Sequence, residues 1–389
     1  MDSIDLLRKI VSIDSVFPGE KELAFFLARE LERSGFLVEM QRFGEKGERY
    51  DVLASRNPQS PASGKPIVLY GHMDTVPPYG YDRIGRDPFV LQEHDGKLFG
   101  LGAYDMKAGV AAILSAVDSV RSDRPLKVMF VSDEEADSRG TYEAAKAGFL
   151  KDCRFALATE ISDISDISER TRTVTLGRRG RVQYEVKVPG VSSHAATLEK
   201  GVSAVTQAAE CAIGIERMNG SLPTHPKLGQ GNQFVRSFRS ESVSLSVPDE
   251  ATLLIDRHLV PPENAESARA DIASRIGQMY DKGRMKEANG ARAKVAVKAR
   301  EVPYLMPYVT PQDNPEVQML SRVIEDRLGS PARYNYGLSV ADENLIAKQG
   351  IPVASLGPIG GGEHSYQEWV SKTSYLELID ILGSFLKRM

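Results

Sequence analysis

Side chains that bind metals or transfer protons recur along this chain where a predicted strand gives way to a loop. Open α/β sheets place their ligand sites along that edge, so we expect these segments to meet there. Taken singly, each cluster is also compatible with a structural histidine or a solvated acidic turn. Together they supply nitrogen and oxygen ligands that suit zinc, namely His72, Asp105, Glu135, Glu160 and His364.

Residues next to these ligands suggest supporting roles. His72 and Asp74 are two positions apart, which places them on the same side of a strand. A nearby carboxylate commonly fixes the tautomer of a ligand imidazole. Glu134 and Glu135 are adjacent, and adjacent side chains of an extended segment point to opposite sides. One of them can therefore bind a metal while the other exchanges a proton with the bound water.

The charges of the predicted ligands favour two metal ions. Two Zn²⁺ ions bring four positive charges, and three carboxylates with one hydroxide bring four negative charges. A single zinc ion would leave a surplus of negative charge in the pocket, so two ions are expected. The same ligands also suit cobalt or manganese.

Two glycine-rich segments accompany the predicted ligands. Residues 100–109 resemble a phosphate-binding loop, but Lys107 is followed by Ala108 rather than by Ser or Thr, and the dinucleotide-binding spacing is absent. We therefore interpret this segment as a tight loop that presents Asp105. The glycines at 360–362 are expected to let the backbone approach a ligand closely.

The composition describes a globular protein and excludes several function classes. Of the 389 residues, 41% are hydrophobic and 26% are charged, and the net charge of −4 predicts neither a nucleic acid nor a membrane as partner. The basic run 178–181 is expected to be solvated surface. Cys153 and Cys211 are expected to be small apolar residues of a reducing compartment. The acidic residues near Met1 differ from a signal peptide, which predicts a cytoplasmic protein.

The elements that must position these residues alternate between helices and strands. Apolar periodicity and turn signals predict helices over 20–34, 106–120 and 375–386 and short buried strands over 51–55, 66–70, 126–131 and 352–356. This alternation predicts an α/β layered domain with a mostly parallel, mixed sheet.

The middle of the chain has a different pattern. Strands are predicted over 182–188, near 242–246, over 251–259 and over 293–297, with helices over 201–218 and 265–279. The order β-α-β-β-α-β is the split pattern of a ferredoxin-like α+β domain. We therefore predict that residues 178–299 form a domain inserted into a larger one, which consists of residues 1–177 and 300–389.

The order of the motifs resembles that of the M20 family of metallopeptidases. The motifs are His-x-Asp at 72–74, Gly-x-Gly-x-x-Asp-Met-Lys-x-Gly at 100–109, Asp-Glu-Glu at 133–135, Glu160 and the glycine-rich loop with His364. The family includes acetylornithine deacetylase, succinyl-diaminopimelate desuccinylase, aminoacylase and the glutamate carboxypeptidases. The resemblance runs to Trp369 and implies a zinc-peptidase-like catalytic domain with an inserted lid.

The resemblance also implies how the predicted ligands are shared between two zinc ions per subunit. His72 and Glu160 would hold one ion, Glu135 and His364 the other, and Asp105 would bridge them. The enzyme would be a metal-dependent amidohydrolase that cleaves an N-acyl amino acid or a small peptide. Family members commonly dimerise through the lid, so a homodimer is expected.

Further roles follow from the resemblance. Asp74 would orient His72, Glu134 would be the general base for a water shared by the two ions, and the peptide bond after Asp105 would be cis. His194, in the predicted lid, would reach the active site of the partner subunit and donate a hydrogen bond to the developing oxyanion.

Two positions depart from the family pattern. Relatives carry an Asn three residues before the lid proline and an Arg two residues after the Asp of the next strand, where this chain has Leu245 and His258. The neighbouring Arg257 would point to the other face of the strand. In relatives both residues help to hold the substrate carboxylate. The substrate therefore stays open between an N-acyl amino acid, cleaved by a deacylase, and a small peptide, cleaved by a carboxypeptidase or dipeptidase. A non-catalytic small-molecule-binding homologue is the third alternative.

Overall fold

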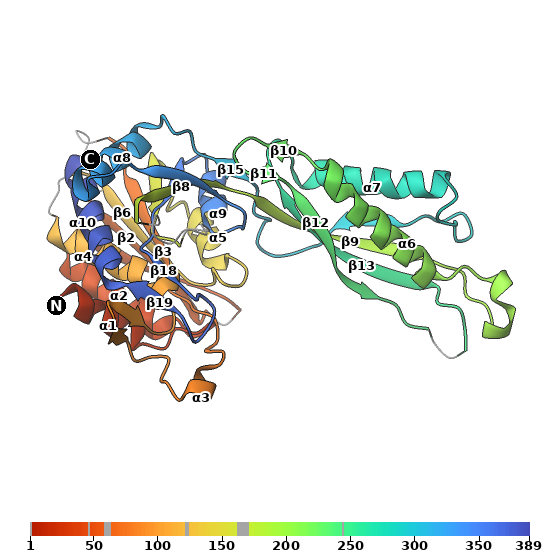
Figure 1. Ribbon diagram of the computed structural model, residues 1–389, viewed down its shortest axis with the longest axis horizontal. Helices are drawn as coiled ribbons and strands as arrows, with labels where there is room; N and C mark the ends of the chain where they lie inside the picture. The colour runs from red at the N-terminus through yellow and green to blue at the C-terminus, as the bar shows by residue number, and fades with distance from the viewer. Residues whose placement is uncertain (1, 46, 58–63, 121–123, 162–170, 243–244) are drawn as a thin grey trace. The chain divides into compact units, whose positions relative to one another are not determined.

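A computed structural model describes residues 2–45, 47–57, 64–120, 124–161, 171–242 and 245–389 (Figure 1). The chain divides into two compact units, and each is described by itself. Unit 1 comprises Met1–Gly177, Val309–Gly337 and Ala341–Met389, and unit 2 comprises Arg178–Tyr308 and Leu338–Val340.

Unit 1 is built from alternating helices and strands. Its helices are α1 (Ser3–Val11), α2 (Lys21–Arg33), α3 (Tyr81–Ile84), α4 (Ala108–Ser119), α5 (Arg139–Lys146), α8 (Pro315–Leu328), α9 (Glu343–Lys348) and α10 (Lys372–Arg388). Its strands are β1 (Leu37–Phe43), β2 (Arg49–Arg56), β3 (Ile67–His72), β4 (Gln92–His94), β5 (Lys97–Phe99), β6 (Leu126–Val131), β7 (Phe155–Ala158), β8 (Thr173–Arg178), β15 (Tyr308–Val309), β16 (Arg333–Gly337), β17 (Val353–Ser355), β18 (Gly360–Gly361) and β19 (Trp369–Ser371).

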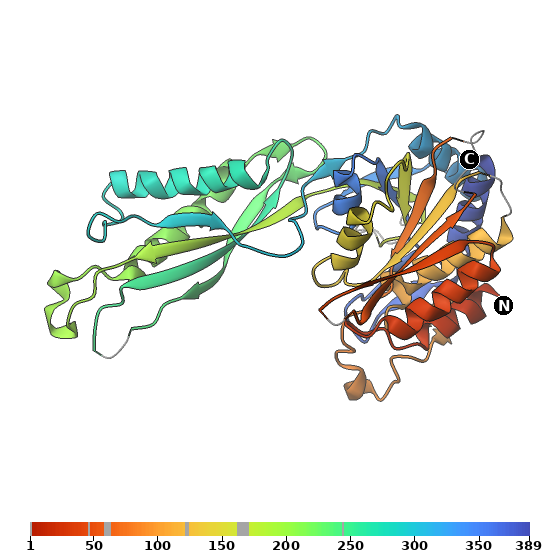
Figure 2. The same cartoon turned by 180° about the vertical axis from the view of Figure 1, so that it is seen from behind.

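Nine of the strands formed by the described residues make one mixed sheet. Its order is β1-β2-β6-β3-β7-β17-β8-β15, with β16 paired to β8. The four central strands, β6, β3, β7 and β17, are parallel to one another, and antiparallel pairs flank them on both sides. Helices α4 and α10 cover one face, whereas α5 and α9 lie on the other (Figures 1 and 2). The predicted α/β class with a mixed sheet is confirmed.

The central strands are buried on both faces, which explains their continuous apolar sequences. Every residue of β3 and β7 is buried. Helix α4 is also apolar around most of its circumference because it packs between the sheet and helix α10. These residues form the core of unit 1.

The parallel register brings the predicted ligand segments to one edge of the sheet. His72, the last residue of β3, is paired with Val131, the last residue of β6, and Tyr70 is paired with Ala158, the last residue of β7. The segments that follow these three strands therefore start side by side. This edge is where open α/β sheets place their ligand sites.

A second, smaller sheet lies in the same unit. It has the order β18-β19-β5-β4, and Gly360 and Gly361 of β18 pair with Val370 and Trp369 of β19. The connection between β18 and β19 carries His364, so this hairpin fixes both ends of the histidine loop.

Unit 2 contains four longer strands and two longer helices. The elements are β9 (Gly180–Pro189), α6 (Ala204–Glu216), β10 (Thr224–His225), β11 (Gly229–Gln230), β12 (Asn232–Arg239), β13 (Glu250–Leu259), α7 (Ala265–Asp281) and β14 (Lys294–Val297). Strands β12, β13, β9 and β14 form an antiparallel sheet in that order. The apolar faces of α6 and α7 share a core with β9 and β13.

One predicted strand of unit 2 was misplaced. Residues 243 and 244 of the predicted strand near 242–246 lie outside the described residues, and the strand that pairs with β13 is β12, Asn232–Arg239. A register shift between Val235 and Ser237 interrupts its alternation, which hides a period of two in the sequence.

The basic run 178–181 is not solvated surface, contrary to expectation. Arg178 is 2% exposed and Arg179 is 8% exposed, and Arg181 forms two hydrogen bonds with the carboxylate of Asp256. Buried guanidinium groups need polar partners, and Arg179 donates to the carbonyl oxygen of Leu228. Cys153 and Cys211 are both free and buried, as expected. Among the described helices, none is long and apolar enough to cross a membrane.

Candidate metal centre

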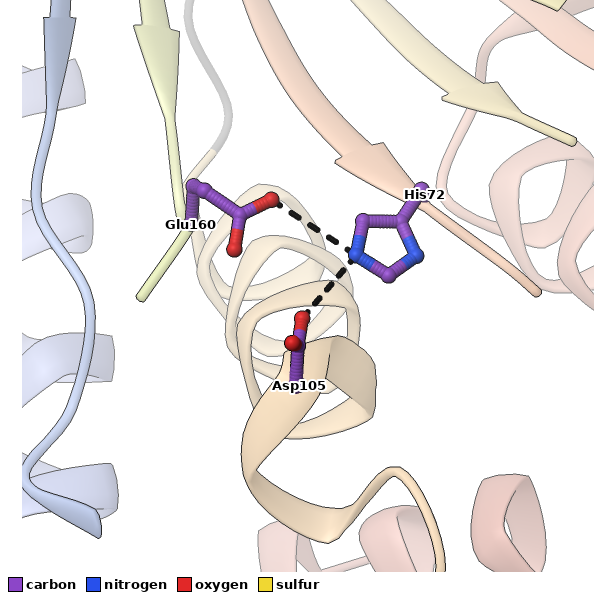
Figure 3. A group of neighbouring side chains, drawn as sticks. All are labelled: His72, Asp105 and Glu160. Atoms are coloured by element: carbon purple, nitrogen blue, oxygen red, sulfur yellow. Dashed lines mark hydrogen bonds and ion pairs between the residues drawn. The ribbon is translucent and has the colours of Figure 1, made fainter. Parts of the chain in front are cut away.

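The first group of predicted ligands lies at the edge of the large sheet (Figure 3). Nε2 of His72 is 3.1 Å from Oδ1 of Asp105 and 3.6 Å from Oε2 of Glu160. The other oxygen of Glu160 accepts the backbone N–H of Ile161, which leaves Oε2 facing the imidazole. All three side chains are buried, so water competes little for their ligand atoms.

The second group shares Asp105 with the first. Nε2 of His364 lies 3.4 Å from Oδ2 of Asp105 and 3.1 Å from each carboxylate oxygen of Glu135. The side chain of His364 is 53% exposed, so this group opens toward solvent. The two oxygens of Asp105 are thus divided between the two imidazoles, and the five predicted ligands form two adjoining groups.

The contacts of His72 favour a cation between its ring and the carboxylates. Nδ1 lies 3.0 Å from the backbone carbonyl oxygen of Asp74. A carbonyl oxygen only accepts, so Nδ1 carries a proton and Nε2 of the neutral ring has a lone pair. Because Nε2 faces only oxygens of Asp105 and Glu160, which accept, either a proton on Nε2 or a metal ion must lie between them.

The spacing within each group also fits a metal ion. Ligands that lie about 2.0–2.2 Å from a tetrahedral zinc are roughly 3.3–3.6 Å apart. The closest pairs around His72 and His364 range from 3.1 to 3.6 Å. All ligand atoms of each group lie within 4.8 Å of one another.

The pKa shifts of the predicted ligands reflect the same arrangement of charges. Burial lowers the pKa of His72, but the hydrogen bond with Asp105 and the charge of Glu160 raise it well above its usual value. Hydrogen bonds with Asp105 and Glu135 raise the pKa of His364 to about 10. Burial raises the pKa of Asp105, but its bonds to the two imidazoles lower it below its usual value. The cluster therefore stabilises positive charge at both histidines.

The Asp-Glu-Glu motif forms a turn, not the extended segment that we expected. Asp133 has φ 79°, and its carbonyl oxygen accepts the N–H groups of Asp137 and Ser138. The Asp74 carboxylate accepts the N–H of Glu134 at 3.2 Å and the N–H of Glu135 at 3.0 Å. The two adjacent glutamates therefore lie within a turn, and Asp74 binds the backbone N–H groups of both.

Glu134 interacts electrostatically with residues of both metal-ligand groups and belongs to neither. Burial raises its pKa well above the usual value, the charge of His72 lowers it, and the charges of Asp342 and Glu160 raise it. A glutamate that binds a proton readily in this position can act as an acid and a base.

Asp105 is presented by a tight loop, as predicted. Gly102 has φ 69°, and a Cβ on it would collide with Thr75, so only glycine fits there. The peptide bond between Asp105 and Met106 is cis, as the resemblance implies. The expected close approach of a ligand to the glycines at 360–362 stays a prediction, but packing within the protein gives a reason for one of them. A Cβ on Gly360 would collide with the ring of Tyr104 and lie 2.6 Å from the carbonyl oxygen of Trp369, so glycine is required there by protein packing.

Sequence reasoning missed two groups that hold the ligand segments. The Glu368 carboxylate accepts three backbone N–H groups from residues 102–105. Arg49 donates to Glu20 and also to Asp133, which begins the turn that contains Glu134 and Glu135, here called the glutamate turn. The only signal in the sequence is a charged residue beside apolar strand residues, which is too common to be informative.

Unit 2 contains the remaining predicted residues. His194 is exposed, and its Nδ1 accepts the N–H of Ala196 at 3.1 Å, so a neutral ring carries its proton on Nε2 and can donate from there. Arg257 is fully buried and pairs with Glu263 and Asp271, so it is committed to the core of the unit.

The two positions that depart from the family pattern are also in unit 2. Nδ1 of His258 lies 3.0 Å from Oδ1 of Asn232, and burial lowers the pKa of His258. The neutral ring is therefore favoured. Leu245 is 75% exposed.

Comparisons with known proteins agree with this arrangement. A sequence model of Peptidase family M20/M25/M40 matches residues 68–388. Succinyl-diaminopimelate desuccinylase from Gluconacetobacter diazotrophicus is 26% identical over 398 residues, which cover 100% of this chain and 97% of that protein. Acetylornithine deacetylase from Proteus mirabilis is 30% identical over 232 residues, which cover 57% and 56%. Aminopeptidase PepT from Bacillus cereus has a similar fold, with a TM-score of 0.76 and 17% identity over 99% of this chain and 97% of its own.

Proposed function

This chain belongs to peptidase family M20/M25/M40, whose members hydrolyse amide bonds, and on that premise we propose that it cleaves an N-acyl amino acid or a small peptide at a two-metal centre. The observation that carries the proposal is the division of the Asp105 carboxylate. Its Oδ1 faces His72 and its Oδ2 faces His364, as a ligand that bridges two ions would.

The ligands would divide between two ions. His72 and Glu160 would hold one with Asp105, and His364 and Glu135 would hold the other with the same aspartate. Nitrogen and oxygen donors suit zinc, and cobalt or manganese can take the same set. When bound, such ions lower the pKa of a coordinated water and polarise the substrate carbonyl.

The protein groups supply the proton transfers. Glu134 takes a proton from the attacking water as the water oxygen bonds to the carbonyl carbon. It then delivers that proton to the amine nitrogen as the C–N bond breaks. Burial raises the pKa of Glu134, so its carboxylate accepts a proton more readily than that of an exposed glutamate. Asp74 holds the backbone of this glutamate in place.

Unit 2 acts as the lid and dimerisation domain in this proposal. His194 donates from Nε2 to the developing oxyanion in the partner subunit, and its contact with Ala196 supports the required tautomer. The division into catalytic and lid domains, the homodimer and the cytoplasmic location stay predictions. The names of the relatives favour an acylated amino acid as substrate, and the neutral ring of His258 makes a weaker partner for a substrate carboxylate than arginine.

The proposal is tested by metal analysis joined to a substrate panel. The purified chain is stripped of metal, reloaded with zinc, cobalt or manganese, and assayed against N-acyl amino acids and dipeptides. We expect two ions per chain and hydrolysis of one substrate class. A chain that binds no metal, or that binds metal and hydrolyses no amide, would instead be a binding protein with this fold.

A further inference from the structure

Glu368 lies outside the ligand set but contacts the segment that presents Asp105. Its side chain is buried, with 2% of the residue exposed. Oε2 accepts the backbone N–H of Gly102 at 2.8 Å, and Oε1 accepts the N–H groups of Tyr104 and Asp105, each at 2.9 Å. One carboxylate thus fixes three amides of a four-residue loop.

This contact reaches both metal-ligand groups because Asp105 belongs to both. One of the N–H groups that Glu368 binds belongs to Asp105. This hydrogen bond therefore fixes the backbone of Asp105, from which its metal-binding side chain extends. The loop cannot easily find another conformation that preserves these bonds, since Gly102 has φ 69° and lies against Thr75. A shift in this loop would therefore move a ligand of two ions at once.

Glu368 also belongs to the loop that carries His364. Its backbone N–H donates to the carbonyl oxygen of Ser365 at 3.2 Å, and the next residue, Trp369, begins β19. The main chain of Glu368 is thus part of the loop that carries His364, and its side chain binds residues 102–105, which present Asp105. Glu368 fixes the distance between segments that are far apart in the sequence.

We propose that Glu368 is a positioning residue that holds Asp105 and His364 at the spacing that metal binding requires. The inference rests on the proposed function, because it assigns Glu368 a role only in a two-metal site. Residues that hold metal ligands in place typically change metal affinity or activity by about 10–100-fold when they are replaced. A carboxylate that merely caps a buried loop would change stability instead.

The variant Glu368→Gln separates these roles. Glutamine keeps the size of the side chain and one acceptor oxygen, but its amide group would oppose the N–H of Gly102 or of Tyr104 and Asp105. Glu316→Gln is the matched control. Glu316 is a buried carboxylate of unit 1, 8% exposed, which pairs with Arg154 away from the metal ligands.

Four quantities are measured on the full chain and both variants. They are the zinc affinity by competition with a chromophoric chelator, the kcat and KM on the substrate identified by the panel, and the thermal stability of the metal-free protein. For Glu368→Gln we expect zinc binding at both sites to weaken at least about tenfold and kcat to fall, with KM within about twofold. Glu316→Gln should change only the stability.

The outcomes are distinguishable. If Glu368→Gln matches Glu316→Gln in zinc affinity and kcat at a similar loss of stability, Glu368 is a structural cap and the inference is wrong. If the unsubstituted chain itself binds no zinc, the proposed function fails first and this inference fails with it. Should Glu368→Gln not fold, Glu368→Asp, which keeps both acceptor oxygens on a shorter side chain, gives the same comparison.

Discussion

Asp74 contacts His72 through its main chain and the glutamate turn through its side chain. Its carbonyl oxygen lies 3.0 Å from Nδ1 of His72, and its carboxylate accepts the N–H groups of Glu134 and Glu135. The carboxylate itself is farther from the imidazole, at 3.7 Å. The predicted role of Asp74, to orient His72, therefore falls mainly on its carbonyl group.

The variant Asp74→Asn should uncouple these contacts. The carbonyl contact with His72 is unchanged, but the amide group opposes one of two backbone N–H donors. We expect kcat to fall by about 10–100-fold, with weaker binding of the ion held by Glu135. Asp87→Asn is the control, because Asp87 also accepts a backbone N–H, that of Phe89, away from the site. Equal effects of the two substitutions on kcat would contradict the role of Asp74.

Glu134→Gln should retain metal but lose turnover. Glutamine cannot take a proton from water, and loss of a general base typically costs about 10²–10⁴-fold in rate. Glu135→Gln should differ, since it alters a metal ligand and should lower the metal content. Metal analysis and steady-state kinetics on both variants check this. A Glu134→Gln variant with normal turnover would show that another group is the base.

Zinc should stabilise the folded chain, and His364→Ala should reduce that stabilisation. A ligand that binds only the native state at 100 times its dissociation constant raises the free energy of unfolding by about 2.7 kcal/mol. His364 is half-exposed, so its removal should change the stability of the metal-free chain little. Thermal unfolding with and without zinc checks both points. A zinc-induced shift of the same size in both proteins would exclude His364 as a ligand.

Gly360→Ala should destabilise unit 1. The new methyl group would collide with the Tyr104 ring, next to Asp105, and overpacking of this kind typically costs about 1–3 kcal/mol. Gly383→Ala, in helix α10, is the control because its nearest atoms lie at an ordinary distance of 3.8 Å. Urea unfolding should separate the two variants. A Gly360→Ala chain as stable as the control would show that the loop can move away from Tyr104.

The predictable part of this structure is the part that local sequence determines. Continuous apolar runs identified β3, β6 and β17 because strands buried on both faces need such residues. The ends of those runs then marked His72 and the Asp-Glu-Glu motif. Parallel pairing brought these segments together without any further signal in the sequence.

The unpredicted part depends on contacts between distant segments. The glutamate turn was expected to be extended because nothing near it shows that Asp74 binds its amides. Glu368 was missed because its partners at 102–105 lie more than 260 positions earlier. Strand β12 was misplaced because a bulge breaks its alternation. Hydrophobic periodicity depends on residues that are close together in the sequence, so it cannot reveal contacts between distant segments.

The unequal spacing of the ligands along the chain has a consequence for biosynthesis. The ribosome delivers His72, Asp105 and Glu160 before it begins unit 2, whereas His364 follows only after unit 2 is complete. Strand β17, which lies between β7 and β8, is also made late. Domains generally fold as units, and unit 1 contains both the first and the last part of the chain, so the second trio of ligands can form only after the last part of the polypeptide is made.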